Sequence, residues 1–124
     1  MAHLTREVFR VLFLDSNNHL LANRIMWEGT VAGVQVHARE VVREALSLNA
    51  TALIFVHNHT SGDPKPSRHD ISVTAKLISA CNPFDVAVHD HIIIARSGFL
   101  SMRSEGLLVQ PWSPDSSAKS KVAL

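Results

Sequence analysis

The side chains best suited to chemistry are concentrated between positions 57 and 70, where two histidines precede an aspartate. His57 and His59 follow an apolar run, residues 52–56, that is typical of a buried β-strand. Because strand side chains alternate, both imidazoles are expected on one face. A loop containing glycine and prolines then leads to a predicted helix opening at Ser67, with Asp70 in its first turn. Two imidazoles and a carboxylate suit Zn²⁺, and three protein ligands leave a fourth position for water.

Ser67 and Asp70 also have an explanation that needs no metal. A serine followed three residues later by an acidic residue, before an apolar-periodic segment, is the pattern of a helix capping box. An aspartate in a first helical turn is favourable in its own right. In a chain with eight histidines, a spacing of two residues also occurs by chance. From these residues alone, a metal site and an ordinary helix start are equally good interpretations.

The full pattern of residues 57–70, His-Asn-His-x-Ser-Gly-Asp-Pro-x-Pro-Ser-x-x-Asp, resembles the JAMM signature of MPN-domain metalloproteases in its bacterial RadC form. Other segments agree with the RadC pattern in the same order: 7–15, 29–30, 36–42, 90–91 and 105–108. The resemblance covers roughly residues 5–108. It implies that His57, His59 and Asp70 are zinc ligands.

The resemblance also implies the fold and its limits. We expect a single α/β domain of the MPN type, related to the cytidine-deaminase fold, in which a mixed, curved sheet packs with two main helices. This domain would span residues 1–109, and residues 110–124, which lack an apolar pattern, would form a flexible tail. RadC proteins usually carry a helical region before this domain, so the chain is expected to be a short form or the MPN domain alone.

Two positions depart from the RadC pattern. Residue 60 is Thr and residue 38 is Ala, where the family usually has Pro. Neither side chain is an expected metal ligand, so these departures concern the rigidity of the loops and leave the ligand set intact.

Hydrolysis by a zinc-bound water also needs a carboxylate that takes up a proton and delivers it to the leaving amine. In JAMM-like proteins this glutamate lies on an early strand, and Glu7 matches by position. Glu28, which precedes Gly29, is the alternative. Ser67 has two compatible roles: it can cap the helix, and the resemblance implies that it contacts the oxyanion of a tetrahedral intermediate.

A second His-x-His pair, His89 and His91, is the rival metal site. It lies among aliphatic residues, so one of its faces is expected to be buried. Asp90 and His91 recur in the RadC pattern, which favours a role in supporting the site over direct metal binding. His69, one residue before Asp70, is expected to face solvent.

The hydrophobic pattern predicts the order of the elements. Residues 7–28 are expected to form a β-hairpin, residues 39–48 a helix, residues 52–57 the central strand and residues 67–80 a second helix. Further strands are predicted at 31–36, 86–88, 91–95 and 99–102, the last two separated by a turn at 97–98.

Composition is consistent with one compact domain in a reducing compartment. A chain of 124 residues, 46% of them hydrophobic, can bury a real core. The formal net charge of +1 gives no electrostatic footprint for nucleic acid. The single cysteine, Cys81, excludes an internal disulfide and a Cys-x-x-Cys zinc site, and is expected to be a buried, inert thiol. No stretch is long and apolar enough for a membrane helix, so we expect a cytoplasmic protein.

Three functions compete at this stage. The preferred one is a zinc-dependent hydrolase that acts on peptide or isopeptide bonds of a protein or peptide substrate. The second is a JAMM-like binding module for protein or DNA, with weak or lost catalysis, which would fit the DNA-repair name once given to RadC. The third is a zinc deaminase, which is excluded because that site needs Pro-Cys-x-x-Cys and the chain has one cysteine.

Overall fold

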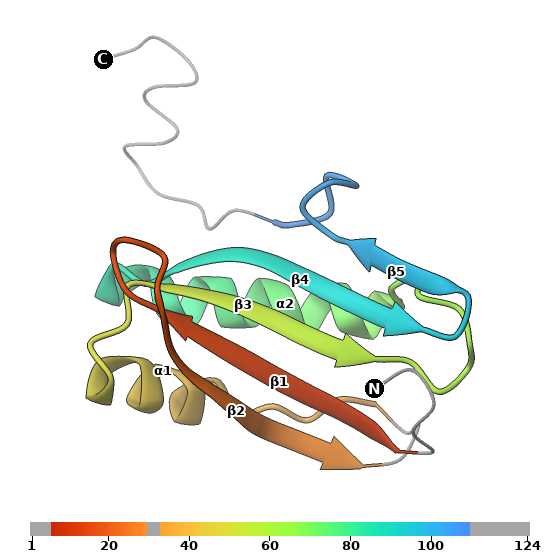
Figure 1. Ribbon diagram of the computed structural model, residues 1–124, viewed down its shortest axis with the longest axis horizontal. Coiled ribbons are helices and arrows are strands. Elements are labelled where there is room, and N and C mark those ends of the chain that lie inside the picture. The colour runs from red at the N-terminus through yellow and green to blue at the C-terminus, as the bar shows by residue number, and fades with distance from the viewer. Residues whose placement is uncertain (1–5, 30–32, 110–124) are drawn as a thin grey trace, which may run out of the picture.

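The computed structural model describes residues 6–29 and 33–109. Figure 1 shows its elements, which follow one another in the order β1, β2, α1, β3, α2, η1, β4 and β5. Their bounds are β1 Glu7–Leu14, β2 Leu20–Gly29, α1 Ala38–Ser47, β3 Ala52–Asn58, α2 Arg68–Cys81, the short 3₁₀ helix η1 Asn82–Phe84, β4 Ala87–Ala95 and β5 Gly98–Ser101.

The five strands form one mixed sheet in the order β2-β1-β3-β4-β5. β1 lies between β2 and β3 and is antiparallel to both, whereas β3 and β4 are parallel neighbours. A parallel pair needs a crossover connection, which α2 supplies between β3 and β4. The expected α/β architecture, a mixed sheet with two main helices, is therefore confirmed.

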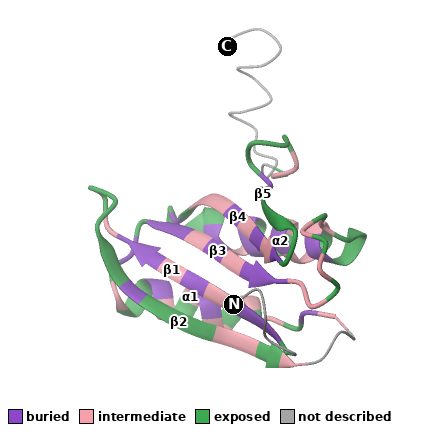
Figure 2. Cartoon of the chain, turned by 45° about the vertical axis from the view of Figure 1, so that its right-hand side comes forward, coloured by how far each residue is buried: buried purple, intermediate pink, exposed green. Residues whose placement is uncertain are grey.

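The two faces of the sheet differ because the helices cover only one of them (Figure 1). Side chains on the covered face pack with those of α1 and α2 in one core, which includes Phe9, Phe13, Phe55, Val41 and Leu77. Figure 2 shows the resulting alternation of buried and partly buried residues along β1 and β3.

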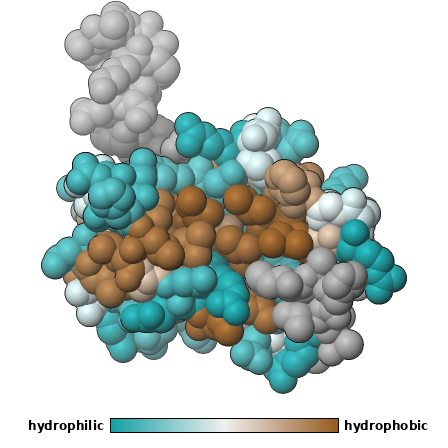
Figure 3. All heavy atoms as spheres, viewed as in Figure 1, coloured by the Kyte–Doolittle hydropathy of each residue, from teal (hydrophilic) through white to brown (hydrophobic). Residues whose placement is uncertain are grey.

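The open face of the sheet carries the alternate residues, among them Leu12, Ile54, Val56, Ile92 and Ile94, all of which remain partly accessible. Figure 3, which looks onto this face, shows a hydrophobic band across its middle. The sheet is thus a layer between the helices and an apolar surface.

Most predicted elements are confirmed to within one or two residues, but two predictions were wrong. Among residues 33–36, no strand forms: Gly33 has a φ of +119°, and the carbonyl oxygen of Val34 faces the His69 ring at 2.7 Å and not a neighbouring strand. The strands predicted at 86–88 and 91–95 are one continuous strand, β4, in which a change of register lies between the two halves.

Cys81 is fully buried at the end of α2, and burial raises the pKa of its thiol to about 11. The thiol is therefore protonated at neutral pH, as expected for an inert cysteine. Within the described residues, neither helix is long and apolar enough to cross a membrane. The expected tail, residues 110–124, lies outside the described residues.

Candidate metal centre

The candidate centre lies where β3 ends and the chain turns toward α2. His57 is the penultimate residue of β3. The next histidine, His59, donates its backbone N–H to the carbonyl oxygen of Ile94 at 2.8 Å, which draws the chain away from β1 and toward β4. The His59 Nδ1 lies 3.0 Å from the Asp63 carbonyl oxygen. Because that oxygen can only accept, the His59 Nδ1 carries a proton, which leaves Nε2 as the ring atom that could bind a metal.

Asp70 comes to the same place because α2 begins with a capping box. The Ser67 hydroxyl oxygen accepts from the Asp70 N–H at 3.0 Å, and the Asp70 Oδ2 accepts from the Ser67 N–H at 2.8 Å. The same Oδ2 lies 2.9 Å from the His59 Nε2. The helix start is thus an ordinary capping box and also aims a carboxylate at the histidines, so the two interpretations of this segment are compatible.

His57, His59 and Asp70 together form a compact group of potential metal ligands. One ligand atom from each lies within 4.8 Å of the others. The side chains of His57 and Asp70 are only 1% and 5% exposed, while that of His59 is 11% exposed and opens to the surface. The His57 Nδ1 lies 3.7 Å from the Asp70 Oδ1.

Glu7 joins this group from the first residue of β1. Its side chain is buried, and its Oε1 lies 3.2 Å from the His57 Nε2. Its Oε2 accepts a long hydrogen bond, 3.4 Å, from the Thr60 N–H, a donor that a proline at this position would lack. Glu28 lies opposite Val8 on β2 and is exposed. Of the two candidate carboxylates, the structure brings Glu7 to the site.

The protonation states of His57 and Asp70 suit a bound cation, whereas His59 would have to release a proton to bind one. Burial lowers the pKa of His57, although the carboxylates of Asp70 and Glu7 act in the opposite direction. The pKa of His59 is raised, chiefly by its hydrogen bond to Asp70. Burial opposes ionisation of Asp70, but hydrogen bonds from His59 and Ser67 hold its pKa well below the usual range. At neutral pH His57 is neutral and Asp70 is charged, as metal ligands must be.

The residues present fit a divalent metal. In the part of the chain that the structure describes, the buried His57 Nδ1 has no hydrogen-bond partner, which is unusual for a buried polar atom. Two imidazole nitrogens and a carboxylate are also the donor set of open zinc sites. A cavity of about 470 Å³ leads to the group, and its lining residues are Glu7, Gly33, Val34, His59, Ser61, Lys65, Ser67, His69 and Asp70.

Comparison with known protein families agrees with the geometry. A family model, the RadC-like JAB domain, matches residues 1–107. The chain belongs to this family. The resemblance expected from the motif is therefore confirmed, and the buried His-His-Asp group of this RadC-like JAB domain is a possible metal site of the JAMM type.

The second histidine pair of the RadC-like domain does not form a comparable group. His91 is buried, and its Nδ1 lies 2.6 Å from the Thr74 hydroxyl, which in turn donates to the Asp70 carbonyl oxygen at 2.7 Å. Burial lowers the pKa of His91 to about 3, so its ring is neutral. His91 thus packs beneath the site and contacts Asp70 through one hydroxyl.

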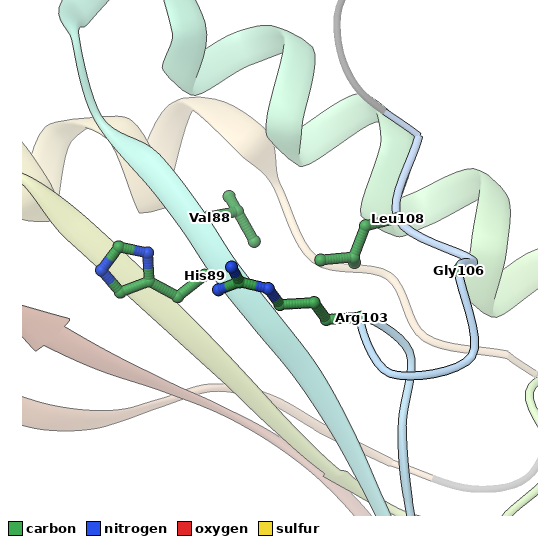
Figure 4. Close-up of a pocket in the computed structure, with 5 residues that line it drawn as sticks. All are labelled: Val88, His89, Arg103, Gly106 and Leu108. Atoms are coloured by element: carbon green, nitrogen blue, oxygen red, sulfur yellow. The ribbon is translucent and has the colours of Figure 1, made fainter.

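Asp90 acts elsewhere in the RadC-like domain. Its carboxylate accepts hydrogen bonds from the Ser101 hydroxyl and from the N–H groups of His91 and Arg103. It therefore fixes β5 and the following turn to β4. His89 lies beside Arg103 in a separate hollow of about 300 Å³, where the Arg103 side chain extends across β4 (Figure 4). The residues that line this hollow include no carboxylate and offer one imidazole, so they make a poor metal site.

Sequence reasoning missed two contributors to the site. Asn58, between the two histidines, is fully buried and hydrogen-bonded to β1. His69 is exposed, as expected, but its Nε2 also lies 2.7 Å from the Val34 carbonyl oxygen, and both residues line the cavity. A polar residue at the end of an apolar strand was a usable signal for Asn58, whereas the contact of His69 depends on the path of residues 33–37.

Proposed function

We propose that this RadC-like domain is a zinc-dependent hydrolase that cleaves peptide or isopeptide bonds. One observation supports this most strongly: a fourth buried side chain, Glu7, lies against the group formed by His57, His59 and Asp70. Binding a structural metal would not need an additional buried carboxylate in the lining of the cavity. A hydrolase needs one, because a proton has to move from water to the leaving group.

His57, His59 and Asp70 would hold the ion. When bound, zinc would supply Lewis acidity and lower the pKa of a water molecule toward neutrality. Three protein ligands would leave a coordination position for water, and the cavity of about 470 Å³ connects the group with solvent. Substrate would therefore enter past His59, the most exposed member of the group.

Glu7 would carry the proton. In this proposal its carboxylate takes a proton from the attacking water, whose oxygen bonds to the carbonyl carbon, and passes it to the nitrogen as the carbon–nitrogen bond breaks. The contacts with the His57 Nε2 and the Thr60 N–H keep both carboxylate oxygens of Glu7 directed toward the centre. General bases of this kind contribute about 10²–10⁴-fold to the rate.

Ser67 would stabilise the substrate oxygen. Its Oγ accepts the helix-capping hydrogen bond from the Asp70 N–H, so the hydroxyl hydrogen is not used by the cap. Ser67 also lines the cavity. We therefore assign it the role of a donor to the oxyanion that forms during attack. The substrate would be a protein or peptide, because the net charge of +1 gives no basis for preferring a nucleic acid.

Glu7→Gln tests the proposal, with Glu28→Gln as the matched control. The zinc-loaded parent and the two variants would be compared on a broad peptide and isopeptide library. Glu7→Gln is expected to keep its zinc and to lose hydrolysis about 10²–10⁴-fold, because the amide cannot accept the proton. Glu28→Gln, which alters an exposed carboxylate on β2, is expected to retain both.

Three outcomes would contradict this assignment. Loss of zinc in Glu7→Gln would make Glu7 a ligand, and hydrolysis that survives in that variant would place the base elsewhere. A zinc-loaded parent that cleaves nothing in the library would favour the alternative function, a JAMM-like binding module.

A further inference from the structure

Asn58, the residue between the two histidines of the centre, is bound to the strand that carries Glu7. Its side chain is fully buried and makes two hydrogen bonds to the backbone at the start of β1. Its Oδ1 accepts from the Val8 N–H at 2.6 Å, and its Nδ2 donates to the Arg6 carbonyl oxygen at 3.0 Å. Arg6 and Val8 are the two chain neighbours of Glu7, which is therefore held from both sides.

The need for this side chain follows from the way the sheet ends. Pairing between β1 and β3 stops at Phe9 and His57, after which the chain turns toward β4. The backbone of β1 nevertheless continues into the buried residues Val8 and Glu7. A carboxamide offers an acceptor and a donor, as a peptide group does. The Asn58 side chain thus replaces the missing backbone partner and extends the ladder past its last regular pair.

The carboxylate of Glu7 is fixed by the same short segment. Its two oxygens contact the His57 Nε2 at 3.2 Å and the Thr60 N–H at 3.4 Å. Residues 57–60 therefore contact both the backbone on either side of Glu7 and its carboxylate. We propose that Asn58 is a positioning residue that holds Glu7 at the metal centre. This inference rests on the proposed function, in which Glu7 carries the proton.

Kinetics of Asn58→Ala can separate positioning from general stabilisation. A displacement of about 1 Å in a reacting group can cost about 10²-fold in rate, so kcat is expected to fall by that order with a smaller change in KM. The loss should disappear in a Glu7→Gln background, because there is no base left to misplace. Asn23→Ala is the matched control: Asn23 is an exposed asparagine of the same sheet that accepts from the Arg10 side chain.

A second readout needs no substrate. The Thr60 amide proton donates to the Glu7 carboxylate, so its NMR chemical shift reports the position of Glu7. In ¹⁵N-labelled, zinc-loaded protein, Asn58→Ala and Glu7→Gln are each expected to shift this signal, and the double variant should match Glu7→Gln alone. Should Asn58→Ala fail to fold, Asn58→Asp keeps the shape and the acceptor for Val8, loses the donor to Arg6, and takes its place in both cycles.

Additive effects of the two substitutions, in rate or in the Thr60 shift, would overturn the proposal. So would a loss of zinc in Asn58→Ala as large as that in His59→Ala, because Asn58 would then position the ligands. A parent that hydrolyses nothing would refute the proposed function, yet the Thr60 measurement would still decide whether Asn58 holds Glu7.

Discussion

The two His-x-His pairs lie on, or directly after, neighbouring parallel strands, but the side chains that surround the two pairs differ. His57 lies at the end of β3 and His59 directly after it, where the chain leaves the sheet and the start of α2 supplies a carboxylate. His91 pairs with Phe55 in the strand register and so lies deeper in the sheet than the first pair. There it contacts the Thr74 hydroxyl on the second turn of α2. The first pair instead contacts the ionised carboxylate of Asp70.

A local irregularity also separates the members of the second pair. Leu53 pairs with Val88 and Ile54 pairs with Asp90, which leaves His89 without a partner in the β3–β4 register. His91 then points into the core, while the His89 Nε2 lies 3.0 Å from the Asn18 Oδ1 in the β1–β2 turn. Spacing alone therefore does not make a metal pair. The group that could hold a metal forms where the end of β3 meets the start of α2.

The largest expected difference between the pairs is in zinc affinity. His59→Ala removes a nitrogen from the donor group and should weaken zinc binding by more than about 10²-fold, since residues that only contact ligands already account for 10–100-fold. His89→Ala is the matched control and should bind zinc like the parent. Titration against a zinc chelator of known affinity measures both. Equal losses in the two variants would mean that the pairs act together.

A further difference is expected in folding stability, and it lies within the second pair. His91 is buried, its ring lies 5.4 Å from that of Phe9, and it contacts Thr74. His91→Ala should lower the free energy of unfolding of the metal-free protein by about 2–4 kcal/mol, from the cavity and the lost hydrogen bond. His89→Ala, at a partly exposed position, should change it by no more than about 0.5 kcal/mol. Urea denaturation measures both values, and equal values would contradict the difference in burial.

Sequence patterns predicted the fold well where local signals were strong. The hairpin turn after Leu14, the apolar run of β3 and the helical spacing of α2 each agree with the structure. The strand predicted at 31–36 is wrong for residues 33–36, and residues 31 and 32 lie outside the described residues. Val34 and Val36 suit a strand, but their path depends on Gly33 and on the distant His69 ring. The division of β4 into two strands had a different cause. Polar residues at 89–91 interrupt the apolar pattern of the sequence, but the sheet accommodates them within one continuous strand.

The candidate site was predictable in its ligands and less so in its supports. His57, His59 and Asp70 lie in one segment of fourteen residues, so the motif alone brought them together. Glu7 is fifty residues away from His57 in the sequence. The register of β1 against β3 was needed to show that Glu7, and not Glu28, is the carboxylate beside the group. Asn58 and Thr60 act through hydrogen bonds to that same strand, which no local pattern encodes.

Metal content tests the central claim most directly. Protein purified without added zinc should contain about one zinc per chain, and X-ray absorption should show nitrogen and oxygen ligands at about 2.0–2.2 Å with no sulfur. His57→Ala, prepared in the same way, should have lost the metal, while His89→Ala should retain it. Full zinc occupancy in His57→Ala would contradict the account, because it would remove the His57, His59 and Asp70 group from the function proposed for it.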